Sequence, residues 1–133
     1  MAQGLVSAFE SEVLNYFLRN QSLTYSRAQM YVALSTAAYS EAATGASMNE
    51  VAGTGYARQT VAFGAPSGTP RALENSGAVT FTAGATWTAV VAMYIVDAAS
   101  GGNVLCGADI TSVVLNNGDS LTFAIGDIDI SLT

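Results

Sequence analysis

The sequence is short of charge, and of positive charge above all. Only 11% of its 133 residues are charged, four are arginine, and lysine and histidine are absent. Affinity for nucleic acid comes mainly from cations that neutralise phosphates and release counterions. A net charge of −6 therefore argues against a nucleic-acid partner, and equally against binding to an anionic membrane.

Catalytic and metal-binding motifs are missing as well. Without histidine nothing activates the single cysteine, Cys106, which lies in an apolar strand pattern and is expected to be a buried structural thiol. Asp127 and Asp129 lie two apart in a strand pattern and could begin a calcium site, but the polar outer face of a terminal strand is the favoured reading. We expect no enzyme, no cofactor and no metal.

Long hydrophobic runs are absent too. The segment behind Met1-Ala2-Gln3-Gly4 is broken by Glu10 and Glu12, which is unlike a secretory signal. The longest apolar run, from Ala89 to Val96, is too short to span a bilayer. We expect a soluble protein with a single domain over residues 1–133.

What is present begins with a helical pattern over residues 1–20. Ser7 with Glu10 fits a capping box, and Asn20 is a plausible stop. The apolar stripe either covers an open face or end of the sheet structure, or makes a helix–helix contact between subunits. Its residues recur at helical spacing: Leu5, Phe9, Val13 and Phe17, widened by Tyr16, Val6, Leu14 and Leu18.

Residues 28–133 predict strands. Apolar and polar residues alternate along 30–35, 56–63 and 128–132, the period of a half-buried strand, whereas 89–96 is nearly all apolar and fits a central strand covered on both faces. Shorter strands are expected near 79–81, 103–108, 111–115 and 121–125, the last two joined by a hairpin at Asn116-Asn117-Gly118-Asp119. About eight strands without helices between them indicate an all-β fold, an antiparallel β-sandwich or jelly roll with one N-terminal α-helix.

Three positions in the strand region attract attention. Arg58 could form an ion pair with Glu50, stack on Tyr56, or reach a neighbouring subunit. A contact within the chain, either the ion pair or the stack, is favoured. Trp87 leads into the most apolar strand, so we expect it to be substantially buried. Asp97 heads a glycine-rich turn, where an aspartate commonly bonds its own backbone.

Several of these segments together resemble a family of small tailed-phage virion proteins, often labelled tail-fibre or minor structural proteins. The element Tyr56-Ala57-Arg58-Gln59 is the most specific. The sequence departs from the family at Ala38-Tyr39-Ser40, where Thr-Pro is frequent, and at Met93-Tyr94-Ile95-Val96. The residues that carry the resemblance are Val32-Ala33-Leu34, Glu50-Val51, Gly55 to Gln59 with Tyr56 and Arg58, Trp87, Asp97-Ala98, and Gly101-Gly102-Asn103.

The resemblance implies a non-enzymatic virion structural protein, assembled in the host cytoplasm and akin in architecture to the jelly-roll cement proteins of phage heads. Sparse charge favours a capsid cement or decoration role, with the major capsid protein as partner. A tail-fibre or baseplate-associated adaptor that binds tail proteins is one alternative. Another is a carbohydrate-binding jelly-roll module, which would expose Trp87, Tyr39 and Tyr94 around a groove.

The helical stripe is the expected partner interface. Leu5, Phe9, Val13, Tyr16 and Phe17 are more apolar than a cap on a small sandwich requires. Burial of each such side chain stabilises an assembly by roughly 1.5–3 kcal/mol. We therefore expect a homo-oligomer, either a dimer or a trimer.

Overall fold

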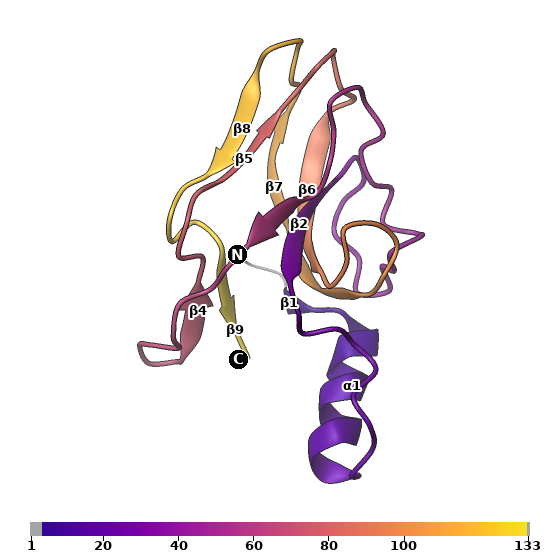
Figure 1. The fold of residues 1–133 in the computed structure, drawn as a ribbon, viewed down its shortest axis with the longest axis vertical. Coiled ribbons are helices and arrows are strands. Elements are labelled where there is room, and N and C mark those ends of the chain that lie inside the picture. Colours follow the sequence, from indigo (N-terminus) through magenta and orange to yellow (C-terminus); the bar gives the residue numbers. More distant parts are fainter. Residues whose placement is uncertain (1–3, 133) are drawn as a thin grey trace.

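A computed structural model describes residues 4–132, which contain one helix and nine strands in antiparallel pairs (Figure 1). This confirms the predicted all-β class with a single N-terminal helix. The elements are β1 (Gly4–Leu5), α1 (Ser7–Leu18), β2 (Met30–Ser35), β3 (Gln59–Val61), β4 (Ala72–Glu74), β5 (Val79–Thr82), β6 (Val90–Val96), β7 (Val104–Val113), β8 (Ser120–Phe123) and β9 (Asp129–Ser131).

One sheet carries most of the fold. Its five strands lie in the order β1-β7-β6-β2-β3, and two separate ribbons pair β4 with β9 and β5 with β8. Both ribbons pack against one face of the large sheet. Phe81 and Phe123 of the β5–β8 ribbon share a core cluster with Leu34 and Met93, and Ile130 of β9 packs against the same cluster. The result is a β-sandwich. Its strand β6 is buried at every position except Val91, which confirms the central strand predicted from the apolar run 89–96.

The half-buried prediction for residues 30–35 is wrong. Ala33 and Ser35 are fully buried, although they lie on the face opposite Val32 and Leu34. The reason is the long loop that follows β2, which folds back over this outer face. The hydroxyl of Ser35 donates to the carbonyl oxygen of Met48, and Met48 joins Ala33 in a second core cluster.

Several strand boundaries also differ from the sequence pattern. The segments 103–108 and 111–115 form one strand, β7, because β6 continues to pair with it from Val104 to Val113. Only Gln59–Val61 of the predicted strand 56–63 belongs to β3. Ala72–Glu74, where the sequence pattern predicted no strand, forms β4 by pairing with β9.

Helix α1 extends from one end of the sheet rather than covering a face of it (Figure 1). It begins at Ser7, after Val6, with no side-chain cap, so the predicted capping box is wrong. Backbone bonds hold its start instead: the N–H of Val6 donates to the Leu105 carbonyl at 2.9 Å, and that of Ser7 to the Glu41 carbonyl at 3.0 Å. Asn20 has a positive φ of 53° and ends the helix, as expected.

Candidate functional site

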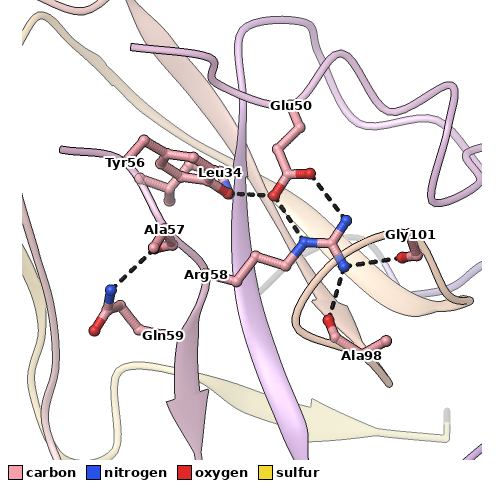
Figure 2. Close-up of polar contacts among 8 residues, drawn as sticks. All are labelled: Leu34, Glu50, Tyr56, Ala57, Arg58, Gln59, Ala98 and Gly101. Carbon is pink, nitrogen blue, oxygen red and sulfur yellow. Dashed lines mark hydrogen bonds and ion pairs between the residues drawn. The ribbon is translucent and has the colours of Figure 1, made fainter. Parts of the chain in front are cut away.

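The most elaborate polar contact centres on Arg58 (Figure 2). Its Nε donates to Oε2 of Glu50 at 2.7 Å and its Nη2 to Oε1 at 2.9 Å, a bidentate pair. Its Nη1 donates to the carbonyls of Ala98 at 2.7 Å and Gly101 at 2.9 Å. Of the three partners considered for Arg58, the ion pair with Glu50 is the one that forms. We call Glu50, Tyr56 and Arg58 the polar clamp.

Tyr56 completes the polar clamp. Its hydroxyl donates to Oε2 of Glu50 at 2.6 Å and accepts the backbone N–H of Leu34 at 3.0 Å. Burial and the bond to Glu50 raise the pKa of Tyr56 far above its usual value. The bonds to Glu50 also raise the pKa of Arg58, although burial opposes them. The clamp is thus saturated with internal bonds and ties β2, two loops and the start of β3 together.

Trp87 is a core residue, as predicted. Only 2% of it is exposed, and its Nε1 donates to the Thr54 carbonyl at 2.8 Å. Tyr94 is buried as well, with its hydroxyl accepting the N–H of Ser40. Two of the three aromatics that a carbohydrate groove would need are therefore inaccessible, and the third, Tyr39, stacks on Tyr94.

The turn from Asp97 to Asn103 has the structural role expected of it. Asp97 accepts both the backbone N–H and the side-chain amide of Asn103, and the N–H of Ser26. Burial alone would raise the pKa of Asp97, but these bonds outweigh it and the pKa lies below its usual value. Gly102 is required here, since its φ is 70° and an added Cβ would lie 2.6 Å from Oδ1 of Asp97.

The terminal acidic pair does not lie on one strand face. Asp127 precedes β9, and its Oδ2 accepts the N–H of Ala124 within the turn. Asp129 is the first residue of β9. Within residues 4–132 no three His, Cys, Asp or Glu side chains are grouped so that they could hold a metal ion. Burial raises the pKa of Cys106 to about 12, which makes the thiol a poor nucleophile.

The predicted interface stripe divides into two parts. The chain after α1 returns along the helix, where Glu12 accepts the N–H and the hydroxyl of Thr24. The ring of Tyr25 packs on Phe9 at 5.4 Å between centroids. Phe9 and Val13 are consequently half-buried, and Leu5 packs against the core.

The other part of the stripe remains exposed. Tyr16 is 40%, Leu14 56%, Phe17 74% and Leu18 77% accessible. None of the described residues of α1 is buried. Helical spacing places Leu14, Phe17 and Leu18 on one side of α1 together with exposed Glu10. We call these four residues the helix row.

Beside α1 lies an apolar groove of about 530 Å³, at the open end of the sandwich. We call it the end groove. Leu5 and Phe9, at the base of α1, form part of its wall, so the groove adjoins the helix. Arg71 is its only charged lining residue in the described part of the chain. Its main apolar lining residues are Met30, Phe63, Leu73, Leu105, Ile130 and Leu132.

The comparison with known families decides what kind of protein this is. The family model described as "Podophage GP4 fiber I protein gp80" matches residues 4–131. The chain belongs to this family. It is therefore a bacteriophage virion structural protein of a fibre family, a class that is generally non-enzymatic, and its place is in the virion. No curated protein matches the sequence.

The residues that carry the family resemblance have structural roles in the described chain. The residues that carry the sequence resemblance, such as Tyr56, Arg58, Trp87 and Asp97, lie in the clamp, the core and the turn that hold the fold. The helix row lies outside these three regions and is exposed, and the end groove is lined mainly by apolar side chains. Among residues 4–132, no helix combines the length and hydrophobicity required to cross a membrane.

Proposed function

We propose that this protein is a fibre-associated structural subunit of the phage tail that binds a neighbouring virion subunit through the helix row and the end groove. The observation that carries the proposal is the uncovered apolar surface at one end of a well-packed sandwich. Five of the seven large hydrophobic residues that are exposed within the described chain lie there, four on α1 and one, Leu132, at the groove. Such concentrated exposure marks an interaction surface.

The family description, which names a fibre protein, favours the tail over the head. Capsid decoration, the role that sparse charge favoured in the sequence, is the second candidate. Its supporting observation is a surface with few charges, on a chain whose charged fraction is 11%. Both roles use the same apolar end, with tail proteins as partner in the first case and the major capsid protein in the second.

Stoichiometry in purified virions separates the two candidates. The band of this protein is compared with that of the major capsid protein on a stained gel, and gold-labelled antibody locates the protein on the particle. A fibre-associated subunit is expected in low copy number, with label at the tail. Label over the head, at a copy number close to that of the capsid protein, would instead support decoration and overturn the proposal.

A further inference from the structure

We propose that the occupant of the end groove is the helix row of a second copy of this chain, and that two copies exchange helices reciprocally. Each copy carries an exposed apolar row on α1 and an apolar groove whose wall includes Leu5 and Phe9, next to the same helix. A two-fold arrangement lets each helix row enter the other groove, so that two chains leave neither surface uncovered. The inference rests on the proposed function only in treating this end as an assembly surface.

The exposure of the helix row and the size of the end groove suit such a contact. Phe17 and Leu18, the most exposed residues of the helix row, lie at the end of α1 that points away from the sheet (Figure 1). The end groove, at about 530 Å³, is large enough for several such side chains. Met30, Phe63 and Leu73 line it with apolar surface, and aromatic anchors packed into such pockets dominate the energy of interfaces.

Charge complementarity points to a second copy in particular. Arg71 is the only charged residue that lines the end groove within the described chain. Glu10 is the only charged member of the helix row, one turn before Leu14. When Leu14 and Phe17 of one copy enter the groove of the other, Glu10 lies toward the groove rim, where an arginine is suited to pair with it.

A membrane surface fits less well. Amphipathic helices that bind membranes carry lysine and arginine on their polar faces. Helix α1 carries Glu10 and Glu12 and has no basic residue in its last turn. The whole chain has a net charge of −6, which anionic lipid would repel.

The first test measures mass in solution by analytical ultracentrifugation of the purified chain. The expected species has twice the mass of one chain. Leu14→Ser with Phe17→Ser is expected to weaken the dimer roughly a hundredfold or more, as loss of central anchors does. Val114→Ser is the matched control, because Val114 is 52% exposed and follows β7, at the end of the molecule away from α1 (Figure 1). It should leave the dimer unchanged.

A charge exchange then tests the pairing. Glu10→Arg alone and Arg71→Glu alone each place like charges in both contacts of the dimer and should weaken it about tenfold. A mixture of the two variants should form a heterodimer of wild-type affinity, because each helix row then meets a groove of opposite charge. The proposal would be overturned by a monomeric wild-type chain or by an assembly larger than a dimer. It would also be overturned if the heterodimer in the mixture bound no more tightly than the homodimer of either variant. None of these results depends on where the protein lies in the virion.

Discussion

The polar clamp and the apolar end of the molecule are organised in opposite ways. In the clamp, the Arg58 side chain is only 2% exposed, and its bonds all go to Glu50, Ala98 and Gly101 of the same chain. At the apolar end, Phe17 is 74% exposed and no described element covers it. The polar groups of the clamp are paired within the chain, whereas the apolar side chains of the helix row remain exposed to solvent.

The difference separates residues that hold the fold from residues to which we assign a role in assembly. A saturated site offers no free donor or acceptor to another molecule, and no buried side-chain polar atom of the described residues lacks a partner. An exposed apolar row contributes little to folding, because both the folded and the unfolded chain leave it in water. Substitutions in the two regions should therefore affect different measurements.

The largest effect on folding is expected from Trp87→Ala. The indole is buried, packs edge-on to Tyr56 at 5.6 Å between ring centroids and lies against Gly53, where an added Cβ would be 2.1 Å from Cδ1. Its removal should lower the free energy of unfolding by about 3–5 kcal/mol, as measured by urea denaturation. Trp87→Phe should lose less. A loss for Trp87→Ala under about 1 kcal/mol would show that the tryptophan is not core.

The next largest effect is expected from Arg58→Met in the polar clamp. It removes both guanidinium donors from Glu50, which keeps only the Tyr56 hydroxyl, and the Arg58 donor from two carbonyls. Breaking a buried pair costs about 3–5 kcal/mol. Because the Glu50 side chain is 25% exposed, water compensates in part and we expect about 2–4 kcal/mol. Urea denaturation of Arg58→Met is compared with Arg27→Met, an exposed arginine. Equal losses in the two variants would contradict a structural role for the clamp.

A smaller effect, and one that depends on pH, is expected from Asp97→Asn. Hydrogen bonds from Asn103 and Ser26 hold the pKa of Asp97 below its usual value despite its burial. A folded pKa below the unfolded one adds stability at pH values above the unfolded pKa, and this stability is lost as pH falls through the folded pKa. Asp97→Asn should therefore cost about 1–2 kcal/mol at pH 7, and the difference from wild type should shrink below about pH 4. A difference that stays constant down to pH 2 would exclude the charge as its source.

The sequence predicts the inner parts of the fold better than the outer ones. The strand at 90–96, the burial of Trp87 and the Asn20 stop follow from local pattern, because hydrophobic periodicity and backbone preference act over a few residues. The full burial of Ala33 and Ser35 does not, since it depends on Met48, in the loop after β2, folding back over the strand. The β4–β9 pairing is also non-local: Leu73 and Ile130 become neighbours only in the folded chain.

The exposed apolar surface at the end of the molecule follows only in part from the sequence. Periodicity identifies the stripe on α1, but it does not show that Tyr25 covers Phe9 while Phe17 remains exposed, because this depends on where the chain goes after the helix. The end groove was missed, since its lining comes from strands far apart in sequence. Leu132 was one available signal, as an apolar residue at the end of a terminal alternating strand.

The smallest effect on folding is expected from Phe17→Ser, which tests the apolar end directly. Phenylalanine and serine have similar helix propensities, and Phe17 is already mostly in water, so the free energy of unfolding should change by less than about 0.5 kcal/mol. Urea denaturation must be done at a chain concentration where the protein is monomeric, because dimerisation would itself add stability. Phe81→Ser, the same substitution at a position that is 1% exposed, is the matched control and should cost about 3–5 kcal/mol. If Phe17→Ser destabilises the monomer as much as Phe81→Ser does, the exposed face of α1 belongs to the core and the distinction between the two regions fails.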